Sequence, residues 1–454
     1  MTIADIVTKQ REFFATNATL AVDYRLAQLQ LLKQVIQTQQ EVIIAALQKD
    51  LGKPRFEAYA SEILILLEEI NFVCKHLKQW VKPQPAKISL GQFPAKGFVY
   101  PQPLGVVLII APWNYPFQLL VSPLIGAIAA GNCAVLKPSE FTPHVSQVIA
   151  QIFRQNFNPA FISVVEGDAT VSQELLAQKF DHIFFTGSTR VGKIVMAKAA
   201  EHLTPVTLEL GGKSPCIIDR AVNIKTAARR VAWGKFFNCG QTCIAPDYVL
   251  VHADIYDQLK AALIDAIREF YGDDPQQSPD YGRIVNDRHW QRLVNFLGEG
   301  QIVWGGNHDR ENLYIAPTIV AGVSWDSPVM QEEIFGPILP LLTYTDLADV
   351  IKKINDRPRP LALYFFSDNK KLQEEVIKSI PFGGGCINDT IMHLSSPYLP
   401  FGGIGDSGMG RYHGKYTFDT FTHYKSILKK SLKFDQQWRY PPYKINLNFL
   451  KWFV

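Results

Sequence analysis

The 454-residue sequence predicts an α/β protein with two doubly wound parallel-sheet domains and a small bridging ribbon. The chain is too long for one small core. From residue 104 onward, short apolar runs such as "GVVLIIAP" and "DHIFFTG" alternate with stretches of helical length. Runs that are apolar on both faces and separated by helices are typical of a parallel sheet covered on both sides.

The elements follow from the sequence in order. Helical stripes such as "YRLAQLQLLKQVIQ" fill the first 80 residues, and a Pro-rich excursion then breaks the helices and favours an edge ribbon. Two sets of strand-like runs follow, and the chain ends in a Gly-aromatic stretch and a basic tail. The expected division is 1–81 with 104–207 as a discontinuous Rossmann-like domain, 208–390 as a second α/β domain, 82–103 with 391–424 as bridging elements, and 425–454 as the tail.

Composition narrows the class of protein. Hydrophobic residues make up 47% and charged residues 19%, an ordinary globular balance. The six cysteines are scattered without a disulfide framework, which favours a reduced, cytoplasmic setting. The tail carries seven Lys or Arg against one acid, a net +6 that leaves −2 for residues 1–424. The body is therefore not expected to bind nucleic acid, and the apolar runs are too short to span a membrane.

Cys243 stands in the stretch "GQTCIAPDY". A buried cysteine is usually an inert small hydrophobe, and reactivity needs a special electrostatic setting. Cys239, four residues earlier, keeps the inert interpretation. A zinc pair of the two cysteines lacks a clear second pair of ligands, so no metal site is expected.

Two polar residues in apolar surroundings are candidates for chemistry. Glu209 lies in the strand-like run "LELGGKSP", where a buried carboxylate is either a general base with a raised pKa or half of a satisfied salt bridge. Asn114 lies in the stiff loop "PWNYP". Its amide could donate to an oxyanion, or it could cap the next helix.

Two strand ends could meet a nucleotide. In "FFTGSTRVGK", Gly187 and Ser188 lead from a strand into a helix, whose free N–H groups favour an anion, although the spacing also fits a plain turn. In "AVLKPSE", Lys137 and Glu140 could reach a ribose, or could be two solvated charges.

Seven motifs occur in one order: "PWNYP", "KPSE", "FTGS", "LELGGKSP", "GQTC", "EEIFGP" and "FGGIGDSGMGRYHGKYTFDTFTH". Together they resemble the aldehyde dehydrogenase superfamily, and are most similar to its class 3, fatty-aldehyde branch. The resemblance covers roughly residues 10–425. It implies that the first domain binds a dinucleotide and that the second carries the nucleophilic cysteine.

The resemblance also implies a role for each site residue. Cys243 is the nucleophile, Asn114 and the Cys243 backbone N–H hold the oxyanion, and Glu209 activates the hydrolytic water. The implied cofactor is NAD or NADP, and the cofactor-binding residues are Lys137 and Glu140 at the adenosine ribose, Gly187 and Ser188 near the pyrophosphate, Glu333 at the nicotinamide ribose and Phe335 near its ring. The expected substrate pocket is lined by Tyr115, Trp233, Thr242 and Phe401.

The expected function is NAD(P)-dependent oxidation of apolar, medium- to long-chain aldehydes to acids, by a homodimer. Glu140 should repel a 2′-phosphate and favour NAD, although class 3 members often tolerate NADP. An acylating enzyme that uses coenzyme A is the first alternative, and the presence of Glu209 counts against it. An inactive membrane-associated scaffold is the second.

The aromatic, basic tail permits two readings. Its Trp, Tyr and Lys residues suit a peripheral membrane contact, and "YKINLNFLKWFV" is too short and too polar to span a membrane. Alternatively, the aromatic residues fold back and wall the substrate entrance.

Overall fold

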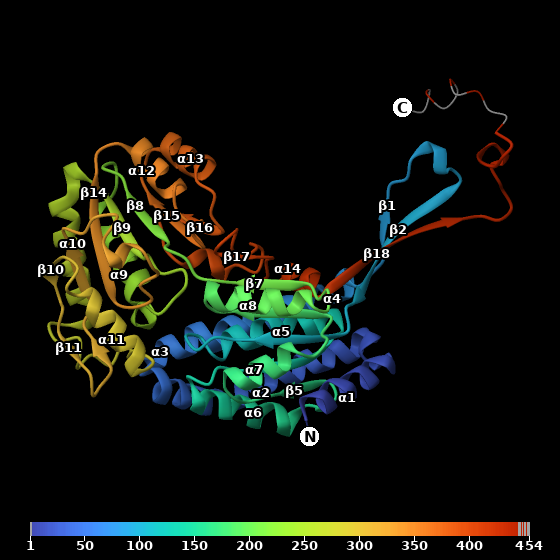
Figure 1. Ribbon diagram of the computed structural model, residues 1–454, viewed down its shortest axis with the longest axis horizontal. Coiled ribbons are helices and arrows are strands. Elements are labelled where there is room, and N and C mark those ends of the chain that lie inside the picture. Colours follow the sequence, from blue (N-terminus) through green and yellow to red (C-terminus); the bar gives the residue numbers. More distant parts are fainter. Residues whose placement is uncertain (1, 444–445, 447, 449–450, 452–454) are drawn as a thin grey trace.

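The computed structural model describes residues 2–443, 446, 448 and 451. It contains two α/β bodies and a three-stranded ribbon that projects from one of them (Figure 1). The predicted fold class of two doubly wound sheets with a bridging ribbon is confirmed.

The first body contains a six-stranded sheet in the order β17-β7-β6-β3-β4-β5. Its strands are β3 (Val106–Ile110), β4 (Cys133–Lys137), β5 (Ile162–Val164), β6 (His182–Thr186), β7 (Val206–Glu209) and β17 (Gly408–Met409). Only β17 is antiparallel. Every residue of β3, β4 and β6 is buried, which explains their unbroken apolar runs. The chain leaves β3 toward β4 and later returns to β6, so a topological switch point lies between β3 and β6.

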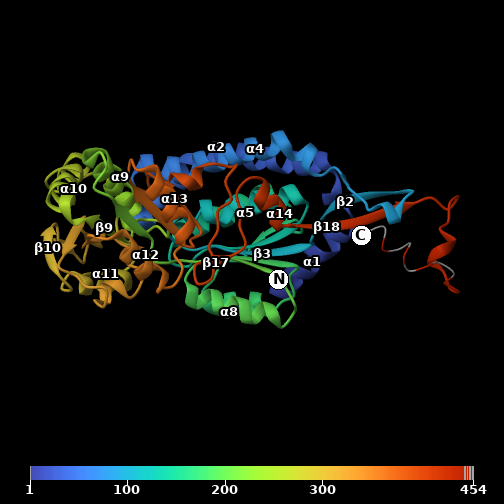
Figure 2. The same ribbon diagram turned by 90° about the horizontal axis from the view of Figure 1, so that it is seen from above.

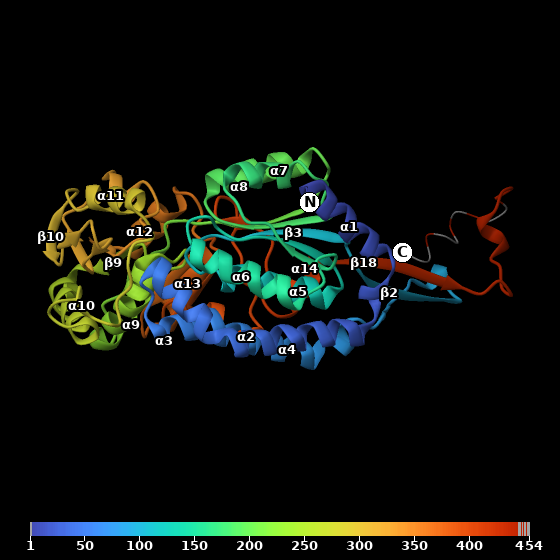
Figure 3. The same cartoon turned by 90° about the horizontal axis from the view of Figure 1, so that it is seen from below.

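Helices cover both faces of this sheet (Figures 2 and 3). On one face lie α1 (Ile3–Ala15), α7 (Ala169–Leu176) and α8 (Thr189–Ala200). On the other lie α2 (Val22–Leu51), α4 (Ile65–Trp80), α5 (Gln118–Ala130), α6 (Pro143–Asn156) and α14 (Lys415–Thr420). The 3-10 turn η1 (Ala18–Leu20) precedes α2, and the short helix α3 (Arg55–Ala58) runs into the π-helical turn η2 (Tyr59–Leu64) before α4.

The second body contains a seven-stranded sheet in the order β10-β13-β14-β9-β8-β15-β16. Its strands are β8 (Pro215–Ile218), β9 (Tyr248–His252), β10 (Gln301–Trp304), β13 (Thr318–Ala321), β14 (Ile338–Tyr344), β15 (Ala362–Phe366) and β16 (Gly384–Ile387). Only β10 is antiparallel.

Helices and turns complete the second body. The helices are α9 (Ile224–Phe236), α10 (Tyr256–Tyr271), α11 (Asp287–Phe296), α12 (Leu347–Asn355) and α13 (Lys370–Ser379). A small hairpin joins β11 (His308–Asp309) to β12 (Tyr314–Ile315). The 3-10 turns are η4 (Phe237–Gly240), η5 (Ala253–Ile255), η6 (Pro328–Met330) and η7 (Met392–Ser395).

The ribbon pairs β2 (Ala95–Pro103) with β1 (Gln84–Ala86) on one side and with β18 (Thr422–Lys430) on the other. The turn η3 (Leu90–Gln92) lies between β1 and β2. The expected boundary between residues 424 and 425 falls inside β18 and is therefore misplaced. Residues 408–409 likewise pair with β7 of the first body rather than with the ribbon.

Beyond the ribbon, the tail forms the short turn η8 (Gln437–Arg439). Gln436 donates from Nε2 to the carbonyl of Phe93 at 2.7 Å, so this part of the tail stays at the outer end of the ribbon. Among the residues that the structure describes, every helix is too short or too polar to cross a membrane. Three aromatic residues of the predicted membrane contact, Phe449, Trp452 and Phe453, lie outside the described residues.

Candidate active site

Cys243 follows a tight turn between α9 and β9. Three consecutive residues in that turn have left-handed backbones: Asn238 (φ 52°), Cys239 (φ 55°) and Gly240 (φ 74°). A Cβ at Gly240 would lie 2.3 Å from the carbonyl oxygen of Gly336, so only glycine fits there. Strained backbone of this kind persists where the surrounding structure holds it, and it is frequent at functional sites.

The surroundings of Cys243 keep its thiol protonated at rest. Burial raises the pKa of Cys243 well above its usual range, and the carboxyl groups of Glu333 and Glu209 raise it further. The thiol of the predicted nucleophile therefore ionises less readily than that of an exposed cysteine. Burial also raises the pKa of Cys239 to about 12, which agrees with the inert interpretation of that residue. The described residues contain no cluster of potential metal ligands.

Glu209 ends β7 and is 2% exposed. Within the described part of the chain, neither of its carboxylate oxygens has a hydrogen-bond partner. The alternative of a satisfied salt bridge is therefore wrong. Burial raises the pKa of Glu209 well above its usual range. An unpartnered buried carboxyl is free to exchange a proton with a bound molecule.

Asn114 lies in the loop between β3 and α5 and is 2% exposed. Helix α5 begins at Gln118 with Phe117 at its N-cap, so the interpretation of Asn114 as a helix cap is wrong. Its Nδ2 donates to the carbonyl of Gln241 at 3.0 Å. A side-chain amide has two N–H donors, and one of them remains for a further acceptor.

Two cavities meet at these residues. One, of about 350 Å³, is mostly apolar and contains the four predicted pocket residues, Tyr115, Trp233, Thr242 and Phe401. The other, of about 450 Å³, is lined by Asn114, Gly187, Ser188, Glu333 and Phe335. The two cavities share Leu119, Thr186, Glu209, Leu210 and Cys243. The thiol and the unpartnered carboxyl therefore lie where an apolar chamber joins a polar one.

The polar cavity reaches the switch point of the first sheet. Ser188 caps α8 by accepting a hydrogen bond from the N–H of Val191 at 3.4 Å. A Cβ at Gly187 would lie 2.5 Å from the tip of the Phe185 ring, so a larger residue there would displace that buried ring. The first N–H groups of α8 and its dipole favour an anion at this point.

Glu333 and Phe335 line the same cavity from the second body. Glu333 Oε1 has no partner among the described residues, and burial together with Asp247 raises the pKa of Glu333 to about 8. Phe335 has a left-handed backbone, with φ at 52°, and its ring centroid lies 5.2 Å from that of Trp113. A free carboxyl and a flat aromatic wall suit a ribose and a planar ring, so these residues fit a nicotinamide nucleotide.

Lys137 and Glu140 line neither of these two cavities. They lie at the carboxyl end of β4, next to β3, with Lys137 Nζ 3.4 Å from Glu140 Oε2. The side chain of Lys137 is only 2% exposed, so the interpretation of both residues as solvated charges is wrong for Lys137 and fits only Glu140. Burial lowers the pKa of Lys137, although Glu140 opposes that effect.

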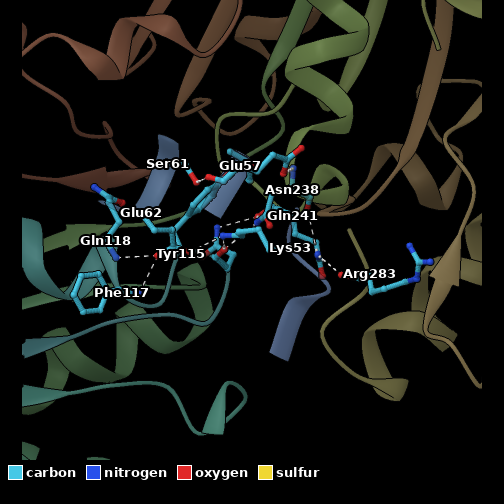
Figure 4. A network of polar contacts seen from close by, with 12 residues as sticks. Lys53, Glu57, Ser61, Glu62, Tyr115, Phe117, Gln118, Asn238, Gln241 and Arg283 are labelled. Carbon is cyan, nitrogen blue, oxygen red and sulfur yellow. Dashed lines mark hydrogen bonds and ion pairs between the residues drawn. The ribbon is translucent and has the colours of Figure 1, made fainter. Parts of the chain in front are cut away.

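Sequence reasoning missed several groups around the site. His289 and Arg292 also line the polar cavity, and Lys235 is a buried ammonium group whose pKa burial lowers to about 8. A buried network centred on Lys53 and Glu62 contacts the backbone of Asn114. Figure 4 shows this network. None of these residues belongs to a short motif, and no sequence signal would have identified them.

The fold and this site are those expected of an enzyme that holds a nucleotide beside a reactive cysteine. Comparison with known proteins gives the family. The model of the aldehyde dehydrogenase family matches residues 1–427. The chain belongs to the aldehyde dehydrogenase family, as its motifs indicated, and is an oxidoreductase.

Curated relatives cover nearly the whole chain. A 4,4'-diaponeurosporen-aldehyde dehydrogenase of Staphylococcus aureus is 52% identical over 98% of this chain and 97% of its own length. Aldehyde dehydrogenase family 3 member A2 of Rattus norvegicus is 48% identical over 96% of this chain and 90% of its own. An aldehyde dehydrogenase of the same species named "dimeric NADP-preferring" is 46% identical over 97% of this chain and 98% of its own length. The predicted similarity to class 3 is confirmed.

Solved structures agree with the fold. A substrate-bound aldehyde dehydrogenase of Staphylococcus aureus has a TM-score of 0.98 and 50% identity, covering 100% of this chain and 99% of its own. An indole-3-acetaldehyde dehydrogenase complexed with NAD+ has a TM-score of 0.87 and 28% identity. The match covers 94% of this chain and 89% of that structure's chain. The prediction of NAD or NADP as the cofactor agrees with these names.

Proposed function

We propose that this enzyme oxidises apolar aldehydes to carboxylic acids through a thioester on Cys243. One observation carries the proposal: Cys243 and Glu209 lie at the junction of an apolar cavity and a polar cavity of about 450 Å³. An aldehyde whose chain fills the apolar cavity presents its carbonyl group at this junction.

Each residue at the junction has one task. Cys243 gives its Sγ proton to water and attacks the aldehyde carbon as a thiolate. The free N–H of the Asn114 amide holds the resulting oxyanion together with the Cys243 backbone N–H. A nicotinamide dinucleotide, when bound, supplies the hydride acceptor. Glu209 then removes a proton from the water that hydrolyses the thioester. Both oxygens of Glu209 are unpartnered, which supports this role.

The cofactor would lie along the carboxyl ends of the first sheet. Lys137 and Glu140 would hold the adenosine ribose, and Gly187 and Ser188 the pyrophosphate at the N-terminus of α8. Glu333 would hold the second ribose, and Phe335 would pack near the nicotinamide ring. NAD is the preferred form because Glu140 would repel a 2′-phosphate.

Long apolar aldehydes are the proposed substrates. The apolar cavity is lined by Tyr115, Trp233 and Phe401, and Phe56 and Met392 lie at its exposed side. A hydrocarbon chain buried there gains about 0.8 kcal/mol per CH₂ group. The KM should therefore fall as the chain lengthens, until the chain exceeds the cavity.

The tail is proposed to touch membranes from the outer end of the ribbon. Leu432, Phe434, Trp438 and Tyr443 are exposed there among basic residues. No residue from 431 to 443 lines the apolar cavity, so within one chain this part of the tail does not wall the entrance. Deleting residues 431–454 should abolish sedimentation with anionic liposomes while leaving the ratio of long- to short-chain rates unchanged. Sedimentation that persists would refute the contact.

A homodimer is proposed through the ribbon. Among the residues that the structure describes, strand β18 pairs with β2 alone, so its other edge presents unpaired backbone groups along nine residues. A second copy would satisfy them. Light scattering should give about twice the chain mass of 51.2 kDa, and the mass of a single chain would refute the proposal.

The test of the activity is direct. The protein is mixed with NAD or NADP and with saturated aldehydes of increasing length, and absorbance at 340 nm is followed with and without coenzyme A. Oxidation that needs no coenzyme A and yields the free acid supports the proposal. A strict need for coenzyme A would support the acylating alternative, and no oxidation of any aldehyde would support an inactive scaffold.

A further inference from the structure

A buried ion pair joins Lys53, just after α2, to Glu62, just before α4. Figure 4 shows this pair beside Tyr115. Lys53 follows Gly52, the left-handed residue that ends α2. Glu62 lies in the π-helical turn η2. Lys53 Nζ lies 2.5 Å from Glu62 Oε1, and both side chains are fully buried. Single π-helical turns inside helices are frequent near functional sites.

The ion pair holds both ends of the segment 114–118. Lys53 Nζ donates to the carbonyl of Asn114 at 3.0 Å and lies 4.2 Å from the centre of the Tyr115 ring. Glu62 Oε2 accepts from the backbone N–H groups of Phe117 and Gln118, both at 3.0 Å. These are donors at the start of α5 that have no partner inside the helix, and a carboxylate is favoured there.

The same segment is tied to the cysteine loop. Asn238 donates from Nδ2 to the carbonyl of Asn114 at 2.9 Å and to that of Gln241 at 3.1 Å. The Asn114 amide also donates to the Gln241 carbonyl, and the hydroxyl groups of Tyr115 and Thr242 lie 2.6 Å apart. The position of the Asn114 amide relative to Cys243 is therefore set by one continuous set of hydrogen bonds.

Lys53 and Glu62 do not take part in the reaction directly. Neither Lys53 nor Glu62 lines the apolar or the polar cavity, so neither touches a bound molecule there. A buried ion pair is by itself weak evidence for stability, because apolar replacements are often as stable. Its bonds to the Asn114 carbonyl and to the start of α5 give the pair a geometric role instead.

We propose that Lys53 and Glu62 are positioning residues that hold the Asn114 amide against the cysteine loop for the attack on the aldehyde. The inference rests on the proposed role of Asn114 as an oxyanion donor. It predicts that the pair affects the formation of the acyl-enzyme while leaving the binding of cofactor and aldehyde nearly unchanged.

The test uses the full-length enzyme carrying the paired substitution Lys53→Met and Glu62→Gln, which removes the ion pair without leaving either partner as an unpaired charge. The rate of NADH formation in the first turnover should fall by about 100-fold, because a small misplacement of a reacting group costs about that much. The KM for aldehyde and the Kd for NAD should stay within about threefold, since uniform binding is not affected.

A double-mutant cycle distinguishes positioning from simple destabilisation. In an Asn114→Ala background, the paired substitution should cost less than about threefold, because the group that it positions is already absent. Arg25→Lys is the matched control. Arg25 is a buried cation that donates to the Ala129 carbonyl at the other end of α5, so its substitution should lower the Tm without slowing the first turnover.

The outcomes separate the two proposals. A first-turnover rate within threefold of wild type, or an equal loss in the Asn114→Ala background, would overturn the positioning role. An unchanged rate in Asn114→Ala alone would instead overturn the proposed role of Asn114. Where the paired variant does not fold, Lys53→Arg enters the same cycle, because it keeps the charge but displaces the donor from the Asn114 carbonyl.

Discussion

Replacing Glu209 with glutamine tests the water-activating role with little structural disturbance. Neither carboxylate oxygen has a partner within the described residues, so the isosteric Glu209→Gln change breaks no hydrogen bond. Burial already raises the pKa of this carboxyl, and an uncharged amide is tolerated at least as well in the same position. The Tm should therefore stay the same or rise, and any loss of activity can be assigned to the chemistry.

The Glu209→Gln substitution is expected to slow the step that follows NADH formation. Removing a general base costs about 10²–10⁴-fold, or about 3–5 kcal/mol in the barrier to thioester hydrolysis. Stopped-flow absorbance at 340 nm should then show a burst of one NADH per active site, followed by slow turnover. Mass spectrometry of the quenched protein should find the acyl group on Cys243.

Glu333→Gln is the matched control, because it also neutralises a buried carboxyl of the polar cavity. It should weaken cofactor binding without accumulating thioester. Normal steady-state turnover in Glu209→Gln would refute the reasoning. So would slow turnover without a burst, because Glu209 would then act before the thioester forms.

Three further predictions concern separate parts of the molecule. Cys243→Ala should abolish oxidation and retain NAD binding, whereas Cys239→Ala should keep most activity; the reverse pattern in steady-state assays would contradict the assignment. Glu140→Gln should raise the kcat/KM ratio of NADP to NAD by about fivefold, since like charges about 4 Å apart in water repel by about 1 kcal/mol, and an unchanged ratio would locate the contact elsewhere. Glu69 is buried in α4 and accepts hydrogen bonds from the Ser122 hydroxyl and the Gly414 N–H. Burial raises the pKa of Glu69 from 4.5 to about 7, so its stabilising contribution is complete below pH 4.5 and is lost as the pH rises toward 7. Glu69→Gln should remove up to about 3 kcal/mol of this pH dependence in urea unfolding, and equal slopes of unfolding free energy against pH in both proteins would exclude Glu69 as its source.

The strands were predictable because each one appears in the sequence as a short apolar run. β3, β4 and β6 are buried at every position, and unbroken apolar runs indicate this without knowledge of distant partners. The end of the ribbon was not predictable in the same way. β18 continues to residue 430 because it pairs with β2, more than 300 positions earlier in the chain.

The candidate site shows the same division. Whether Glu209 has a hydrogen-bond partner depends on the side chains that other segments place around it. The sequence alone therefore could not decide whether Glu209 is a general base or half of a salt bridge. Lys53 and Glu62 are nine positions apart and resemble ordinary surface charges of helical segments. The π-helical turn η2 carries Glu62 to the buried ammonium group of Lys53.

Negative charge is unfavourable at the junction of the two cavities. Burial raises the pKa of Cys243, Glu209 and Glu333 alike, and the two carboxyl groups raise that of the thiol further. Cysteine attacks as a thiolate, so the proton must leave Sγ near the moment of attack and the charge must pass at once to the aldehyde oxygen. In the proposed mechanism, the Asn114 amide donor stabilises that charge where it arises. We therefore expect the rate of attack to depend on the placement of the Asn114 amide donor.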